Sequence, residues 1–275
     1  MTYDKSRQLA YRIRRHALDM TNRGGTAHIG SIFSMADIVA VLYADVMRYD
    51  PANPKWPGRD RLVLSKGHAG AGIYAALAEC GFFPLSELET HCQNGSRLSG
   101  HVSHKGVPGV EVSTGSLGQG MPMAMGMAMA GKMNGEPHSV FCIIGDGECD
   151  EGAIWESALI ANQFGLDNLI VTVDFNKIQS IASVEKTIRL EPLDQKWASF
   201  GWHVIRIDGH DHAALHRAYA DAQAARGQGK PIVVIADTVK GKGVSFMEND
   251  VLWHYRTARG EEYDRAVKEL EAQKP

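Results

Sequence analysis

Residues 139–147 read Ser-Val-Phe-Cys-Ile-Ile-Gly-Asp-Gly, a short apolar run that ends in a Gly-Asp-Gly turn. A second apolar run, 169–173, is followed by Asp174-Phe-Asn176. Both runs have the length and composition of buried β-strands, so Asp146 and Asn176 come at the carboxyl ends of two predicted strands. Ligands bind at that edge of open parallel sheets, and a helix beginning after Gly152 would direct its backbone N–H groups at an anion there.

These two polar residues suit a cation that holds a diphosphate. Mg²⁺ prefers octahedral oxygen coordination and shares its sphere between a few protein oxygens and phosphates. We predict that its ligands are Asp146, Asn176 and the main-chain oxygen of Ile178. Gly-Asp-Gly alone also occurs in ordinary strand-to-helix turns. The strand before it and the matching asparagine after the next strand favour the metal site.

The composition is that of a soluble globular protein. The chain has 275 residues, 44% of them hydrophobic and 22% charged, with a formal net charge of -3. This length predicts one large α/β domain over residues 1–275, and neither a nucleic-acid nor a membrane partner is indicated. The four cysteines show no CxxC spacing, which indicates reduced thiols. Because the N-terminal residues are too polar for a signal peptide, we expect a cytoplasmic location.

Apolar runs alternate with helix-sized segments along most of the chain. Strands are predicted at 61–65, 139–144, 169–173, 203–207 and 232–236. Helices are predicted at 5–22, 152–165, 211–226 and 261–271, with another capped by the Ser34 hydroxyl. The Met-, Ala- and Gly-rich stretch 118–131 predicts a helix that is either packed closely on all sides in the core or part of an interface. The alternation indicates an α/β fold, a parallel sheet flanked by helices.

Histidines are frequent in the predicted loops. Five of them stand in glycine-flanked turns or other loops where a side chain would face a cleft: His28, His68, His101, His210 and His254. A lone loop histidine is usually just solvated. The motifs around these histidines give them more weight.

Eight separated motifs, in order, resemble the N-terminal half of transketolase over nearly the whole chain. They are Ala27-His28-Ile-Gly30, Leu64-Ser-Lys-Gly-His68, Gly100-His101, Thr114-Gly-Ser-Leu-Gly-Gln-Gly120, Gly145-Asp-Gly147, Glu151-Gly152, Asp174-Phe-Asn176, and Lys240-Gly-Lys-Gly243 with Trp253-His254. The resemblance implies a thiamine diphosphate-binding fold. It also implies the diphosphate-binding subunit of a split transketolase, which transfers a two-carbon ketol unit from a ketose to an aldose.

The resemblance assigns roles to individual residues. Mg²⁺ would be bound by Asp146, Asn176 and the Ile178 carbonyl, with His68, Gly147 and His254 near the diphosphate of thiamine diphosphate. Gly115 and Leu117 would offer backbone groups to the aminopyrimidine. The catalytic set would be His28, His101, His254 and Glu151. The histidines would exchange protons with the sugar, and Glu151 would meet an acidic residue of the partner, which would raise its pKa.

The resemblance also implies a partner. A C-terminal-half, pyrimidine-binding subunit would complete the site, two of each chain would assemble, and the substrates would be sugar phosphates. This chain alone would then bind Mg²⁺ and cofactor weakly and be inactive. The glutamate that helps to activate the cofactor's pyrimidine ring belongs to the other half.

The sequence departs from the usual transketolase pattern at two places. Lys-Ile-Gln-Ser-Ile-Ala follows Asn176 in place of a glycine-containing continuation, and Tyr-Arg follows His254 where glycine is usual. Two other classes share part of the pattern. The α subunits of 2-oxoacid dehydrogenases and the deoxyxylulose phosphate synthases have the Gly-Asp-Gly and Asn site but fit His28, His68 and His101 less fully. A non-catalytic regulatory homologue is the other alternative.

Overall fold

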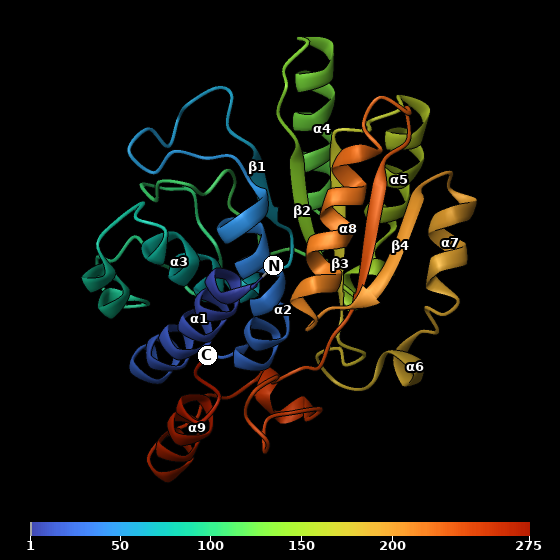
Figure 1. Cartoon of the computed structure of the whole chain (residues 1–275). Helices are drawn as coiled ribbons and strands as arrows, with labels where there is room; N and C mark the ends of the chain where they lie inside the picture. The colour runs from blue at the N-terminus through green and yellow to red at the C-terminus, as the bar shows by residue number, and fades with distance from the viewer. Residues whose placement is uncertain (1) are drawn as a thin grey trace.

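The computed structural model describes residues 2–275 as a parallel sheet covered by helices on both faces (Figure 1). Its strands are β1 (Arg61–Leu64), β2 (Val140–Gly145), β3 (Leu169–Phe175), β4 (His203–Asp208) and β5 (Ile232–Asp237). They lie in the order β1-β2-β3-β5-β4, and each pair is parallel. The predicted strands and the α/β fold class are confirmed.

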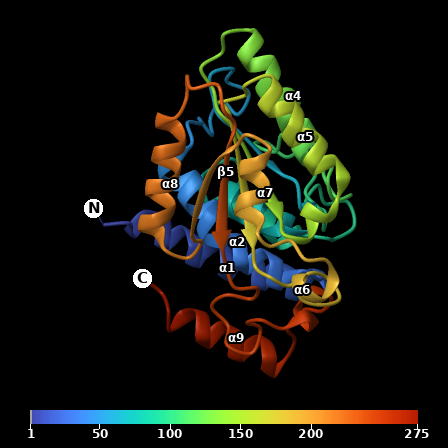
Figure 2. The same ribbon diagram turned by 90° about the vertical axis from the view of Figure 1, so that its right-hand side faces the viewer.

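The helices come from the segments between the strands and from the two ends. They are α1 (Asp4–Gly24), α2 (Ile29–Val41), α3 (Gly70–Glu79), α4 (Gly120–Met133), α5 (Gly152–Gln163), α6 (Val184–Thr187), α7 (Leu193–Ser199), α8 (His212–Ala224) and α9 (Glu261–Glu271). Figure 2 shows α8 on one side of β5 and α4 with α5 on the other. The predicted helices at 5–22, 152–165, 211–226 and 261–271 are present.

Two hydrophobic cores lie on the opposite faces of the sheet, because successive strand side chains point to opposite sides. One core joins Phe141 and Val234 to α1, α2, α3 and α8. The other joins Cys142 and Val233 to α4, α5 and α7. β2, β3 and β5 are almost entirely buried, as expected for strands covered on both faces.

Helix α2 lies deep in the first core. Every residue of Ile29–Val41 is buried, and a turn of π-helix, Leu42–Val46, continues it. Within residues 2–275 the segment Ile29–Val46 is long and apolar enough to cross a membrane, but 83% of it is buried inside the molecule. Its apolar sequence is therefore accounted for by packing in the core.

One local prediction is wrong, and so is one of the two alternatives for another. α2 begins at Ile29, so Ser34 lies inside the helix, where its hydroxyl bonds to Asp174 of β3 instead of capping the helix. Helix α4 is not packed on all sides, because Met123 is 41% exposed and Met133 is 80% exposed. Ala124 and Ala128 form its buried face together with Met121, whereas Met123 and Met133 turn outward.

Candidate active site

The carboxyl ends of β1, β2, β3 and β5 open onto one pocket with a volume of about 170 Å³. Each strand end supplies a lining residue: Lys66 follows β1, Asp146 follows β2, Asn176 follows β3 and Lys240 follows β5. Since Gly145 and Asp174 are paired neighbours in the sheet, the turns that carry Asp146 and Asn176 lie side by side. The strand pattern predicts this placement.

Asp146 is a buried acid held by backbone groups. It is 3% exposed, and its carboxylate accepts hydrogen bonds from the N–H groups of Gly147 (2.7 Å) and Lys177 (2.5 Å). Burial, together with the nearby charge of Asp174, raises the pKa of Asp146 to about 7. A positive ion beside it would reverse both effects and keep this carboxyl group ionised.

The oxygen atoms around Asp146 fit a hard divalent cation. Asn176 is 4% exposed and lines the pocket, and Ile178 lines it too. Together they offer a carboxylate, an amide oxygen and a carbonyl oxygen, the ligand types that Mg²⁺ takes. Among residues 2–275 there is no group of three His, Cys, Asp or Glu side chains placed to hold a metal. A cation here would therefore need further oxygens from a bound group, as a diphosphate would supply.

A second buried acid, Asp174, is fully compensated by its neighbours. Lys66 donates to it from the end of β1, and Thr238 and Ser34 donate from two other elements. Although burial opposes ionisation, the Lys66 ammonium lowers the pKa of Asp174 below its usual value. The same ammonium donates to the Ser31 carbonyl at 3.0 Å. Asp174 therefore anchors the base of the pocket as a carboxylate.

Four predicted histidines come together at the pocket. The ring centroids of His28 lie 5.0 Å from His68, 5.7 Å from His101 and 5.0 Å from His254, and those of His68 and His254 are 5.4 Å apart. His28 precedes α2 with a left-handed backbone (φ 74°), and its N–H donates to the His254 carbonyl at 3.1 Å. A left-handed non-glycine residue is strained, and such strain often marks functional sites.

Three of these histidines, His28, His68 and His254, are neutral near pH 7. Burial, with His101 and Lys240 adding positive charge, lowers the pKa of His28 to about 4. Burial and Lys240 lower the pKa of His254 to about 3. Burial and Lys66 hold the pKa of His68 well below its ordinary value. A neutral imidazole can donate a hydrogen bond with one nitrogen and accept one with the other.

The loop that contains Gly115 and Leu117 packs against the end of β1. Leu117 lines the pocket, and Gly115 lies behind His101, whose ring would be 3.3 Å from an added Cβ. Gly67 must be glycine, because its Cβ would lie 2.1 Å from the Thr114 carbonyl oxygen. The close approach of these two backbones places the loop against the pocket.

Sequence reasoning missed Glu148, which ties the ends of β1 and β2 to the loop before α4. This residue is 1% exposed, and it accepts hydrogen bonds from the Ser65 hydroxyl, from Gly118 N–H at 2.8 Å and from Gly145 N–H at 3.2 Å. Burial raises the pKa of Glu148. Its place directly after Gly-Asp-Gly was the available signal.

Lys240 also had no predicted role, although its motif was recognised. It is 1% exposed, and its ammonium donates to the carbonyls of Ile178 (3.0 Å) and Gln179 (3.1 Å). Its Nζ also lies 3.1 Å from Nδ1 of His254. Burial lowers the pKa of Lys240 to about 8. The Lys240 ammonium therefore lies beside the Ile178 carbonyl, one of the oxygens grouped around Asp146.

Two further predictions, for His210 and Glu151, have different outcomes. His210 does not face this pocket, because its ring is bonded to Asp37 of α2, so its prediction as a cleft residue is wrong. Glu151 is exposed and immediately precedes α5. The contact with a partner carboxylate concerns a second chain and stays a prediction.

The sequence matches one protein family over nearly its whole length. The profile of the family described as "Transketolase, thiamine diphosphate binding domain" matches residues 5–271. The 6-deoxy-6-sulfo-D-fructose transketolase subunit of Clostridium sp. (strain MSTE9) is 45% identical over 259 residues, covering 94% of each chain. An apulose-4-phosphate transketolase subunit from Actinobacillus succinogenes is 39% identical, and the match covers 98% of this chain and 97% of that relative.

Solved structures give the same result for the fold. The transketolase from Leishmania mexicana has a TM-score of 0.90 at 33% identity, and the one from Campylobacter jejuni has 0.91 at 32%. The matches cover 97% and 98% of this chain but 41% and 43% of those chains. This chain therefore spans about two fifths of the length of these solved transketolases, whereas it matches the two subunits above over nearly their full length.

Proposed function

The chain belongs to the transketolase family, with its thiamine diphosphate-binding domain, and on that premise we propose that it forms one half of an active site that transfers a two-carbon ketol unit from a ketose to an aldose. The observation that carries the proposal is one pocket in which the neutral rings of His28 and His254 lie together with a group of oxygen ligands that contains a single carboxylate, that of Asp146. The two relatives described above are named as transketolases, which favours this reaction over that of 2-oxoacid dehydrogenases or deoxyxylulose phosphate synthases.

The residues of the pocket fit Mg²⁺ and thiamine diphosphate. Asp146, Asn176 and the Ile178 carbonyl would hold the cation, and Lys240 adds a positive charge for the diphosphate. Gly147, His68 and His254 also line this end of the pocket. Backbone groups of Gly115 and Leu117 would contact the aminopyrimidine. Thiamine diphosphate supplies a nucleophilic carbon and an electron sink for cleavage of the ketose bond between C2 and C3.

The histidines would handle the protons of the sugar. His28, His101 and His254 would donate hydrogen bonds to oxygens that become negative, and they would take protons from hydroxyl groups. Because His28 and His254 are neutral near pH 7, each can accept a proton as well as donate one. Rings about 5 Å apart can serve adjacent oxygens of one substrate.

A second subunit would complete the site. Relatives that this chain matches end to end are named as subunits, which supports a separate partner. An apolar surface suits that partner: Met123 on α4, with Leu159, Ile160 and Phe164 on or just after α5, are each at least 40% exposed. We call this surface the α4–α5 face. Glu151 is exposed at the start of α5, within reach of a chain bound there. We further propose two copies of each subunit and a cytoplasmic location.

The proposal is tested by a ketol-transfer assay with a ketose phosphate, an aldose phosphate, Mg²⁺ and thiamine diphosphate. The chain is assayed alone and mixed with the C-terminal-half protein encoded beside its gene. Activity in the mixture alone is the expected result. Robust turnover by the single chain would contradict the split site, and inactivity of the mixture toward ordinary, branched and sulfonated sugars would favour a non-catalytic role.

A pair of histidine variants makes the assay specific for the pocket. His101→Ala should abolish most of the activity of the mixture, because the ring lines the pocket. His104→Ala is the control, since His104 lies in the same loop, is exposed and bonds to Ser113. Equal activity of the two variants would remove His101 from the proposed mechanism.

A further inference from the structure

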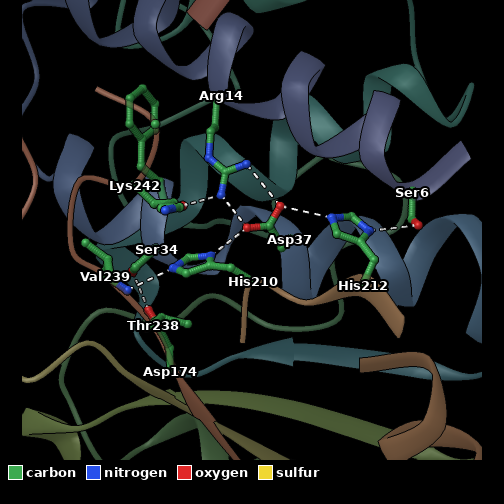
Figure 3. Close-up of polar contacts among 12 residues, drawn as sticks. Ser6, Arg14, Ser34, Asp37, Asp174, His210, His212, Thr238, Val239 and Lys242 are labelled. Carbon is green, nitrogen blue, oxygen red and sulfur yellow. Dashed lines mark hydrogen bonds and ion pairs between the residues drawn. The ribbon is translucent and has the colours of Figure 1, made fainter. Parts of the chain in front are cut away.

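Behind the pocket a buried carboxylate joins three helices (Figure 3). Asp37 of α2 accepts hydrogen bonds from both terminal nitrogens of Arg14 on α1, at 3.0 and 2.5 Å. It also bonds to Nδ1 of His210 at 2.7 Å and to Nε2 of His212 at 3.1 Å. Burial opposes ionisation, but the Arg14 charge and the histidine hydrogen bonds hold the pKa of Asp37 well below its usual value. Asp37 is therefore a carboxylate and only accepts.

The partners of His210 fix its tautomer. Since Asp37 only accepts, Nδ1 of His210 must carry a proton and donate it. On the other side of the ring, the N–H of Val239 donates to Nε2 at 2.9 Å, so this nitrogen must be unprotonated. His210 is therefore a neutral ring that connects Asp37 to the backbone of Val239, as Figure 3 shows.

Val239 directly precedes Lys240, whose ammonium reaches the pocket. The segment is held at other points too: the Thr238 hydroxyl donates to Asp174, and Gly241 N–H donates to the Gly30 carbonyl at 3.0 Å. The bond to His210 anchors the peptide group between Thr238 and Val239, one peptide unit before that of Lys240. It comes from a side chain that does not line the pocket.

We propose that His210 is a positioning residue that holds the 238–241 segment so that Lys240 meets the diphosphate end of the pocket. This inference rests on the proposed function, which supplies the diphosphate. The part of the ring that matters is Nε2, because it bonds to Val239, whereas Nδ1 serves the Asp37 network.

Two substitutions separate the two nitrogens of the ring. In His210→Asn the amide can replace Nδ1 and keep the bond to Asp37, but it is too short to reach Val239. In His210→Gln the longer side chain places an amide oxygen near the position of Nε2, where it can accept from Val239 N–H. His212→Asn is the reference variant, because His212 also bonds to Asp37 but its other nitrogen bonds to Ser6 of α1.

The experiment is calorimetric titration of thiamine diphosphate, at saturating Mg²⁺, into this chain complexed with its C-terminal-half partner. His210→Asn should weaken binding by about tenfold, the equivalent of one lost hydrogen bond. His210→Gln and His212→Asn should stay within about threefold of the wild type. In a Lys240→Met background the cost of His210→Asn should fall to about twofold or less, because the two residues act through one contact.

The outcomes separate the inference from the function on which it rests. A wild-type complex that binds no thiamine diphosphate would overturn the proposed function and this inference with it. If the wild type binds but His210→Gln is as weak as His210→Asn, or if the His210→Asn effect persists in full beside Lys240→Met, only the inference is overturned. Should His210→Asn fail to fold, His210→Gln decides by itself, since tenfold weaker binding by that variant would contradict the role of Val239.

Discussion

Three histidine side chains of the pocket differ from free histidine chiefly because they are removed from water. Burial is the largest influence on the pKa of His28, His68 and His254, and the charges of Lys66 or Lys240 act in the same direction. A protonated ring in this place would have to share a confined space with a buried ammonium group. The pocket therefore keeps these three rings neutral at the expense of stability in acid.

This cost can be measured at His28. Its pKa is about 4 in the folded chain and 6.5 without the fold, so in the interval between them the unfolded state binds the extra proton. Stability is therefore lost as the pH falls through 6.5 toward 4. Between about pH 7 and pH 5 the unfolding free energy should fall in both the wild type and His28→Gln. We expect the fall to be smaller in His28→Gln by roughly 1 kcal/mol, a figure that discounts the pKa shift of His28 for its partial exposure to solvent. Urea denaturation at the two pH values measures it, and identical drops would contradict the assignment.

Glu148 gives a second prediction at this scale. Each carboxylate oxygen of Glu148 accepts a hydrogen bond from the backbone N–H of a different segment. Glu148→Gln replaces one of these oxygens with an NH2 group, which would then face a backbone N–H donor. We expect a loss of about 1–3 kcal/mol in unfolding free energy. Glu156→Gln, at an exposed position of α5, is the control and should change stability by no more than about 0.5 kcal/mol. Equal melting temperatures for both variants would contradict the structural role of Glu148.

At the scale of single residues, the sequence predicted the groups that stand in motifs and missed those that serve them. His28, His101 and Asp146 were predicted because they stand in glycine-containing motifs, and they meet in the structure. Glu148 accepts from the Ser65 hydroxyl and from two backbone N–H groups. Ser65 and Gly118 lie 83 and 30 residues away, so these contacts have no local sequence pattern. His210 looked like a pocket residue because its turn resembles the others, but its partner Asp37 lies 173 residues away.

Among the elements, α4 and α5 together leave several large apolar side chains uncovered. Leu159 is 59% exposed and Phe164 is 57% exposed, although both are large and apolar. Leaving such side chains in water is unfavourable, and groups of them mark contact surfaces. The α4–α5 face is accordingly the surface of this chain on which we expect the partner subunit to dock.

Charge placed on this face should prevent assembly. We expect Phe164→Glu to weaken binding to the C-terminal-half subunit by at least about tenfold, because a carboxylate would lose its water in the contact. Leu85→Glu is the matched control, since Leu85 is also exposed, at 47%, in a different part of the chain. Analytical ultracentrifugation of the mixtures gives the comparison. Unchanged association of Phe164→Glu would move the docking surface elsewhere.

Long elements were predictable, and their exact environments were not. β2, β3 and β5 are continuous apolar runs, so burial on both faces could be read from them directly. The start of α2 was misplaced because Ser34 is a good capping residue by type, while in the fold its hydroxyl bonds to Asp174. A contact between residues 140 positions apart overrides a local preference, and one sequence does not show it.

For the whole molecule, the buried charge of Asp146 predicts a link between cofactor and stability. Thiamine diphosphate and Mg²⁺ together should stabilise the assembled protein by about 2.7 kcal/mol at a hundredfold excess over Kd, because they bind only the folded state. Asp146→Asn should abolish the Mg²⁺ dependence of the melting temperature. Asp221→Asn, at an exposed position of α8, should preserve it. A magnesium effect that survives in Asp146→Asn would exclude this carboxylate as a ligand.

The order of the strands has a consequence for synthesis on the ribosome. In the described sheet β5 lies between β3 and β4, so β4 has no strand neighbour until Ile232–Asp237 has been made. Until then the growing chain exposes an open edge on β3 and an unpaired β4, and such edges invite aggregation. The sheet can close only after Ile232–Asp237 has left the exit tunnel. We therefore expect the nascent chain to depend on chaperones in the interval when β3 and β4 have emerged and β5 has not.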